Sequence, residues 1–106
     1  MSAETLRGHL DLVLLACVQR GPLHGYALIQ ELRRRSNGSF NLPEGTVYPA
    51  LHRLERSGYL KSRSGTVQGR RRRVYSLTRA GRKALDAEAT AWRQFAETLN
   101  VVIEST

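Results

Sequence analysis

The sequence predicts a mainly α-helical protein with one small β-hairpin, and three observations lead to this expectation. Apolar residues recur at helical spacing in four separate stretches. Between the third and fourth stretches, two short segments near glycines read as β-strands. The 106 residues, 41% hydrophobic and 25% charged, suffice for one globular domain with a modest core. The expected order is three helices, a hairpin and a last helix.

The first two helices are predicted from apolar spacing and from the stop signals that follow. The first covers residues 6–18 and ends before Gly21-Pro22, since proline cannot continue a helix. The second covers roughly residues 25–35 and is followed by the turn segment Ser36-Asn37-Gly38. The residues of the second helix that share an apolar face are Leu28, Ile29 and Leu32.

A third helix is predicted where Val47, Leu51 and Leu54 are spaced i, i+4 and i+7. Pro49 fits this helix if it begins around residues 44–46, because the first N–H groups of a helix have no intrahelical partner to lose. Thr46 is then the expected N-cap. Ser57-Gly58 is expected to end the helix.

The hairpin is predicted from the segments "YLKSRSG" and "RRRRVYSLT", joined by a loop through Gly65 and Gly69. In the second strand, Tyr75 and Leu77 fall on one face. Thr78 is the expected cap of a long last helix. Two neighbouring helices followed by a basic hairpin make a winged helix-turn-helix. We therefore expect a winged helix-turn-helix domain over residues 1–78, with its wing at about 59–78, and a C-terminal dimerisation helix over 79–106.

Positive charge is concentrated in one third of the chain. The whole chain has a net charge of +8. Residues 53–83 hold eleven Lys or Arg and one acid, so this segment alone carries 11 − 1 = +10. The remaining residues hold six basic and eight acidic side chains, or 6 − 8 = −2. This distribution favours a face that binds a polyanion over a generally basic surface.

The third helix is the first candidate for contact with DNA. With its apolar residues turned inward, the opposite face carries cations and hydrogen-bonding side chains suited to phosphates and base edges in a major groove. An ordinary solvated face is the alternative. The candidate residues on this face are Thr46, Tyr48, Pro49, His52, Arg53 and Arg56.

The hairpin and the start of the second helix are further candidates. Arg70, Arg71, Arg72 and Arg73, beside Lys61 and Arg63, indicate a wing on the phosphate backbone or in a minor groove. A solvated patch or an RNA-binding arm remains the alternative. His24 and Tyr26 open the second helix, whose N–H groups could receive a phosphate. A turn-packing role, with Gly25 allowing close helix approach, is equally open.

The sequence does not indicate an enzyme, a cofactor or a bound metal. His9, His24 and His52 lie on three different helices, and the basic region holds a single acid, Glu55, where a nuclease would need clustered carboxylates. Cys17 is alone, so no disulfide is expected, as in a cytoplasmic protein, and its side chain is expected in the core. The run "LDLVLLACV" is much shorter than the ~20 residues of a membrane span, so no membrane partner is expected.

Three motifs together resemble the PadR family of bacterial transcriptional regulators. They are "GPLHGYALIQEL", "EGTVYPALHRLERSGYL" and "GRRRRVYSLTRAG". Val47 and Arg71 depart mildly from the usual pattern, where Leu and Pro are commoner. The single last helix is similar to that of the short subfamily. The resemblance implies a homodimer that binds a palindromic operator in double-stranded DNA, usually as a repressor that a small molecule or another signal releases.

A dimer is also expected because the last helix carries an apolar stripe that a monomer would leave in water. The residues expected at the dimer interface are Leu6, Leu10, Val13, Leu85, Trp92, Phe95, Leu99 and Val102. Trp92 either fills this interface or, as some short PadR-like regulators imply, lines a slot for a planar aromatic effector. Two other functions remain open, namely a less specific nucleic-acid-binding or RNA-associated protein and a dimer that chiefly sequesters ligands.

Overall fold

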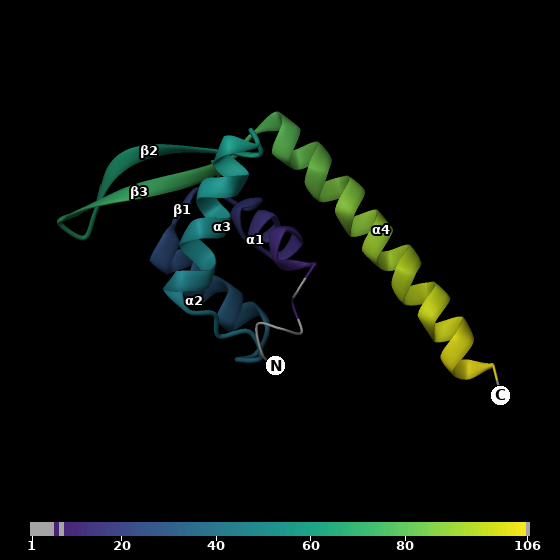
Figure 1. Cartoon of the computed structure of the whole chain (residues 1–106). Helices are drawn as coiled ribbons and strands as arrows, with labels where there is room; N and C mark the ends of the chain where they lie inside the picture. Colours follow the sequence, from purple (N-terminus) through teal and green to yellow (C-terminus); the bar gives the residue numbers. More distant parts are fainter. Residues whose placement is uncertain (1–5, 7, 106) are drawn as a thin grey trace.

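The computed structural model describes residue 6 and residues 8–105 (Figure 1). In chain order, the elements are α1 (Leu10–Val18), β1 (Leu23–His24), α2 (Gly25–Arg35), α3 (Glu44–Arg56), β2 (Leu60–Val67), β3 (Arg70–Leu77) and α4 (Arg79–Glu104). The predicted fold class is confirmed: helices α1 to α3 form a compact body, the hairpin of β2 and β3 projects from it, and α4 runs away from it.

The core lies between α1, α2, α3 and the base of the sheet. The predicted inward residues of α2 and α3 are all buried, and Leu42, Leu60 and Tyr75 close the same cluster from the loop and the strands. Helix α2 has the predicted bounds, and the turn after it contains Asn37 and Gly38 at positive φ (53° and 82°). Apolar spacing was sufficient to place these helices because each buries a single stripe.

Helix α1 begins at Leu10, four residues later than predicted. Gly8 has φ +87°, a left-handed conformation that does not continue a helix. Leu6 lies in the turn before it, where its carbonyl accepts a hydrogen bond from the His9 N–H at 2.7 Å. Leu6 is nonetheless buried in the core, which is why its apolar spacing imitated an earlier helical turn.

The predicted N-cap of α3 is wrong. The cap is Pro43, whose carbonyl accepts hydrogen bonds from the N–H groups of Thr46 and Val47 at 3.0 and 3.2 Å. Helix α3 does start within the predicted window, at Glu44, so Thr46 lies inside its first turn. Pro49 therefore lies in the second turn and has no N–H to give to the Gly45 carbonyl. Proline is tolerated there because this side of the helix is exposed and water can solvate that carbonyl.

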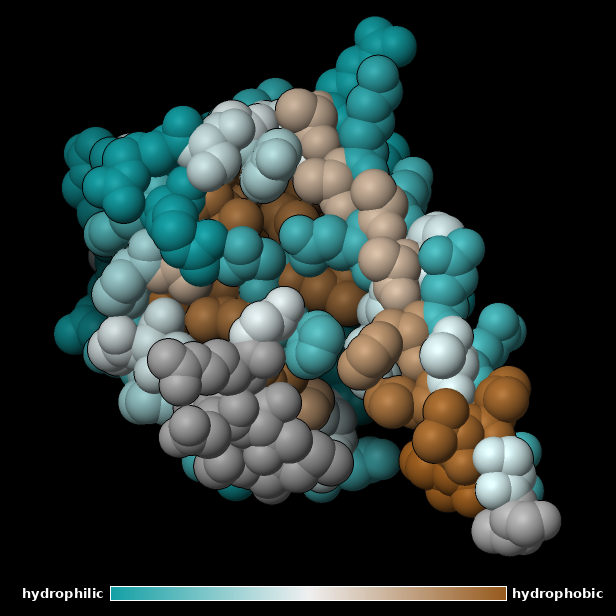
Figure 2. Space-filling view, turned by 45° about the vertical axis from the view of Figure 1, so that its right-hand side comes forward, coloured by the Kyte–Doolittle hydropathy of each residue, from teal (hydrophilic) through white to brown (hydrophobic). Residues whose placement is uncertain are grey.

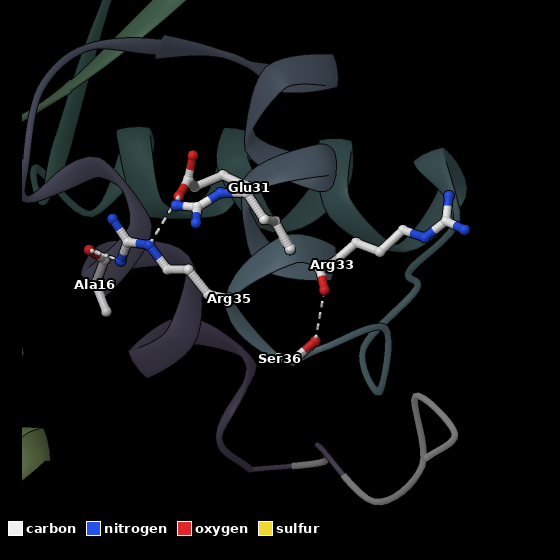
Figure 3. A network of polar contacts seen from close by, with 6 residues as sticks. Ala16, Glu31, Arg33, Arg35 and Ser36 are labelled. Carbon is white, nitrogen blue, oxygen red and sulfur yellow. Dashed lines mark hydrogen bonds and ion pairs between the residues drawn. The ribbon is translucent and has the colours of Figure 1, made fainter.

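The last turn of α2 is anchored to α1 by the polar contacts in Figure 3. Glu31 accepts hydrogen bonds from Arg34 and, at 3.0 Å, from Nε of Arg35. Arg35 also donates from Nη1 to the Ala16 carbonyl near the end of α1 at 3.2 Å. These guanidinium groups lower the pKa of Glu31. The contact fixes where α2 ends relative to α1 and gives a second donor to the Ala16 carbonyl, which also accepts from the Gln19 N–H at 3.4 Å.

The sheet has three strands in the order β1-β3-β2, all antiparallel. The two-residue β1, which pairs Leu23 with Tyr75, is too short for a sequence pattern and was not predicted. The predicted loop through Gly65 is also wrong, because Gly65 pairs with Arg72 inside the ladder. The strands are joined only by Gln68 and Gly69, both at positive φ (51° and 78°), as a tight hairpin turn requires.

Helix α4 begins as predicted, with the side chain of Thr78 accepting a hydrogen bond from the Gly81 N–H at 2.9 Å. Gly81 fits against the hairpin base so closely that a Cβ there would lie 2.0 Å from the Tyr59 carbonyl oxygen. Beyond Leu85, no residue of α4 that the structure describes is buried. The helix gives the molecule its length, with extents of 58 × 28 × 21 Å.

Candidate nucleic-acid interface

Helix α3 presents a narrow exposed face. Val47, Leu51 and Leu54 point into the core, as predicted. The 100° step of the helix then places Pro49, His52 and Arg56 opposite them, and all three are exposed. This face combines a cation with a hydrogen-bonding imidazole, the side-chain types that read base edges and phosphates.

Tyr48 and Thr46 stand at the edges of this face. Tyr48 is half-buried, and its ring covers the start of α2: a Cβ on Gly25 would lie 2.4 Å from Cε1 of Tyr48. The close helix approach at Gly25, one of the two alternatives left open by the sequence, is present. Thr46 is also half-buried. A helical wheel shows only where a residue lies around its own helix, so it placed both with the exposed residues.

Arg53 is paired with α1. Its Nη1 and Nη2 donate to the two carboxylate oxygens of Asp11 at 2.8 and 2.7 Å. The sequence prediction placed Arg53 with the outward cations because it had no means of finding a carboxylate 42 residues earlier in the chain. Asp11 was not among the predicted site residues.

The opposite edge of α3 is tied to the hairpin. Ser62 on β2 donates from Oγ to Oε2 of Glu55 at 2.6 Å and accepts from Nη1 of Arg73 at 2.9 Å. Glu55, the single acid of the basic region, is thus linked to an arginine through this hydroxyl. Arg73 is thus partly engaged within the protein. Ser62 was not among the predicted site residues, since a lone serine in a strand carries no signal.

The sheet register divides the hairpin cations between two faces. Arg71 and Arg73 share the face of Tyr75 and Leu77, which packs toward the helices, because side chains alternate along a strand. The other face carries Lys61, Arg63, Arg70 and Arg72. Across the described residues, no hydrogen bond or ion pair involves the side chains of Arg70, Arg71 and Arg72. The wing therefore offers unneutralised cations on both faces.

A cleft separates the tip of the wing from the start of α2. It has a volume of about 430 Å³ and is lined by His24, Tyr26, Gln30, Val67, Gln68, Arg70 and Arg72. His24 caps α2, since its Nδ1 accepts a hydrogen bond from the Ala27 N–H at 3.2 Å. Burial and then the charge of Arg72 lower the pKa of His24. The neutral ring keeps its proton on Nε2, since a backbone N–H can only donate.

The expected dimer residues fall into two groups. Leu6 and Leu85 are buried within the chain, and Leu10 and Val13 are partly buried against its core. The others, Trp92, Phe95, Leu99 and Val102, are exposed on α4, together with Val101 and Ile103. Figure 2 shows apolar residues gathered at the C-terminal end of this helix. A folded single chain thus leaves a large apolar surface in water.

Trp92 lies over the start of α1. Its ring is edge-on to His9, with centroids 5.0 Å apart, and tilted against Phe95 at 6.1 Å. An open pocket of about 220 Å³ lies beside it, lined also by Leu12, Glu88 and Ala91.

Cys17 is buried, and burial raises the pKa of its thiol, which disfavours the reactive thiolate.

Two kinds of site find no support in the described residues. The described residues contain no cluster of His, Cys, Asp or Glu that could hold a metal ion. None of their helices combines the length and the apolar character that crossing a bilayer demands. What the described chain does present is a winged helix-turn-helix with a basic face, the fold of a large class of DNA-binding proteins.

Comparison with known proteins identifies the family. Residues 14–87 match the Transcriptional regulator PadR-like family, and the chain belongs to this family of DNA-binding regulators. It is 41% identical over 93 residues to the transcriptional regulator Rv3488 of Mycobacterium tuberculosis, covering 88% of this chain and 84% of that protein. It is 30% identical over 103 residues to an uncharacterized protein X of Lysinibacillus sphaericus, covering 96% and 94%.

Solved structures support the same assignment. A transcriptional regulator from Clostridium thermocellum superposes with a TM-score of 0.87 at 28% identity, over 95% of this chain and 99% of that one. A PadR family regulator from Eggerthella lenta gives a TM-score of 0.86 at 27% identity, over 98% and 89%. The resemblance predicted from three motifs is thereby confirmed.

Proposed function

We propose that this protein is a homodimeric repressor that binds a palindromic operator, with α3 in the major groove of each half-site. The observation that carries this proposal is the exposed face of α3, which contains His52 and Arg56. Beside it lies a hairpin whose Arg70, Arg71 and Arg72 have no hydrogen-bond or ion-pair partner among the described residues. An α-helix fits the major groove, where each base pair presents a distinct pattern of donors and acceptors. His52 and Arg56 are the side chains we assign to base contacts.

The wing supplies affinity and register. Arg70, Arg71 and Arg72 reach the phosphate backbone or an adjacent minor groove, and Lys61 and Arg63 extend the same cationic surface. His24 and Tyr26 at the start of α2 face the cleft beside the wing, where a phosphate can accept from Nε2 of His24. Such contacts are independent of sequence and depend strongly on salt.

The dimer forms through α4. Trp92 and Leu99 are seven residues apart on one face, 42% and 41% exposed, and a second copy of the stripe is the surface that complements them under two-fold symmetry. Partly buried Leu10 and Val13 on α1 lie at the margin of this contact. Two copies of α3 then meet half-sites about one DNA turn, ~34 Å, apart.

Release from the operator follows binding of a small planar aromatic effector beside Trp92. The pocket at Trp92 and Phe95 is apolar and open, and across a two-fold axis it would be doubled. A ligand that favours one packing of the α4 helices shifts the spacing of the two α3 helices and so weakens operator binding. The protein acts on DNA in the cytoplasm and catalyses no reaction in this scheme.

Selection of bound duplexes from a random pool tests the proposal. We expect one palindromic sequence to be enriched and to be bound far more tightly than a scrambled duplex at the same salt concentration, typically by 10³-fold or more. Equal binding of both duplexes would instead indicate a less specific nucleic-acid-binding protein, for which the arginine run alone would suffice. Strong ligand binding without any operator would point to a ligand-sequestering dimer.

A further inference from the structure

Helix α3 is tied on both flanks by polar contacts. On the hairpin side, Glu55 holds the hydroxyl of Ser62 at 2.6 Å. On the α1 side, Arg53 holds Asp11 through two hydrogen bonds of 2.8 and 2.7 Å. Residues 53 and 55 are about 200° apart around a helix, so the two contacts lie on opposite sides of α3. The face with His52 and Arg56 lies between them and remains exposed.

The two ties differ in what else supports them. The hairpin follows α3 directly along the chain, and the Tyr59 N–H bonds the Leu54 carbonyl at 3.0 Å, so covalent continuity also holds β2 against α3. Helix α1 has no such link. In the part of the chain that the structure describes, its contacts with α3 are apolar apart from the Asp11–Arg53 pair. Apolar contacts set a distance but little direction, whereas a two-pronged guanidinium–carboxylate pair has a planar, defined geometry.

Helix α1 is also the element that joins α3 to α4. His9, two residues before Asp11, touches Trp92 on α4 with ring centroids 5.0 Å apart. Leu12, one residue after Asp11, lines the pocket beside Trp92. Any shift of α3 relative to α1 is therefore also a shift of α3 relative to α4, the helix that we assign to the dimer. In a two-fold dimer, such a change moves both α3 helices.

We infer that Arg53 is a positioning residue, which with Asp11 sets the separation and tilt of the two α3 helices and thereby the half-site spacing that the dimer accepts. This inference rests on the proposed function, since it requires a dimer and a two-part operator. Asp11 holds one N–H on each Nη of Arg53, so the protein fixes the plane of this guanidinium, and a base could be reached only by the three N–H groups that remain. The pair lies outside the core, with side chains 48% and 32% exposed, so we expect the fold to tolerate its removal.

The test uses the full chain and the duplex that the wild-type protein selects from a random pool. The duplex is also made with its half-sites one base pair closer and one base pair farther apart, a displacement of ~3.4 Å, and as a single half-site. The variants are Asp11→Asn, Arg53→Gln, the double variant, and the exchanged pair Asp11→Arg with Arg53→Asp. Asp86→Asn is the matched control, because it removes an exposed carboxylate of α4 that makes no hydrogen bond or ion pair among the described residues.

We expect wild type and Asp86→Asn to prefer the selected spacing. Each single variant should lose roughly threefold or more of that preference, and the double variant should match the singles, because the effects of touching residues are not additive. Affinity for the single half-site and the salt slope should stay unchanged. The exchanged pair should restore the spacing preference, and the unchanged affinity for the single half-site distinguishes positioning from a general loss of stability. Thermal unfolding confirms that every variant is folded.

Two results would overturn the inference while leaving the proposed function standing. One is a spacing preference that none of the variants alters. The other is a changed base preference or a salt slope reduced by about 0.9 in Arg53→Gln, which would show that Arg53 touches DNA directly. Failure of the wild-type protein to select any duplex, or to dimerise, would instead contradict the proposed function and remove the basis of the inference.

Discussion

Gly25 at the start of α2 lies directly under the ring of Tyr48 on α3: a Cβ on Gly25 would be 2.4 Å from Cε1, 2.6 Å from Cζ and 2.8 Å from the hydroxyl oxygen of Tyr48. A side chain at this position fits only if the Tyr48 ring moves. The close fit lets the two helices of the helix-turn-helix approach each other, and it accounts for glycine between His24 and Tyr26.

Gly25→Ala should therefore destabilise the protein. Forcing a methyl group into a packed space costs typically 1–3 kcal/mol, more than the roughly 0.4–1 kcal/mol that replacing glycine by alanine gains from the unfolded state. Urea unfolding measures the difference. Gly45→Ala is the control, because nothing lies within 4 Å of a Cβ at that position, and it should be neutral or stabilising. Adding Tyr48→Ala to Gly25→Ala should remove the strain; fully additive destabilisation would show that the Tyr48 ring is not its source.

The cap of α2 makes stability depend on the protonation of His24. The pKa of His24 is lowered from 6.5 by burial and by Arg72, so the folded state binds its proton less readily than the unfolded state. The contribution of the neutral cap is therefore fully present above pH 6.5 and is lost as the pH falls from there through the lowered folded-state value. Thermal unfolding at a series of pH values should show this decline.

His24→Asn should remove that pH dependence while keeping an acceptor for the Ala27 N–H, since Asn is a good N-cap. His24→Ala should also remove it, at a cost of about 0.5–2 kcal/mol at neutral pH. An unchanged decline in His24→Asn would assign the effect to another group.

The wing and α3 should have separable roles. Replacing Arg70, Arg71 and Arg72 by glutamine should weaken binding to all duplexes alike, and the slope of log K against log salt should shrink by nearly 0.9 for each phosphate that the protein no longer neutralises. His52→Ala should instead change the preference between sites, by roughly 1–3 kcal/mol if His52 makes paired hydrogen bonds to a base. Fluorescence anisotropy with labelled duplexes measures both effects. The reverse pattern would exchange the assignments of wing and helix.

The dimer should depend on one face of α4. Leu99→Asp should give monomers at micromolar concentration in sedimentation, because it places a charge in the apolar stripe that contains Trp92. Val101→Asp is the matched control: Val101 is 68% exposed but lies about 200° around the helix from Leu99. Val101→Asp should leave the dimer intact. A wild-type protein that is already monomeric would refute the dimer itself.

Trp92 gives a direct signal for an effector, since it is the single tryptophan of the chain. Planar aromatic dyes should quench its fluorescence saturably by stacking in the pocket beside Phe95. Trp92→Ala should abolish binding of those dyes, followed by their own fluorescence, and leave the dimer intact. If no dye quenches Trp92 and Trp92→Ala dissociates the dimer, Trp92 fills the interface and an effector site lies elsewhere.

Local patterns in the sequence were sufficient for the helices, the hairpin and the family, although not for β1 or for the start of α1. The buried stripe of α3, the cap at Thr78 and the alternation around Tyr75 each depend on residues within two helical turns or one strand, where spacing determines which side is buried. The errors were also local. Thr46 was taken for a cap that Pro43 provides, and Gly65 was taken for a loop residue although the positive φ of Gln68 and Gly69 already completes the turn.

The tertiary structure alone shows which of the charged residues have partners within the protein. Spacing assigned Arg53 and Arg73 to the same basic surface as Arg56 and Arg70, because like residues are indistinguishable until their neighbours are known. Asp11 occupies Arg53 across 42 residues, and Ser62 links Arg73 to Glu55. The effective charge of a cation and the direction of its side chain depend on whether it has such a partner within the protein. That condition depends on interactions between distant segments, which periodicity and composition do not contain.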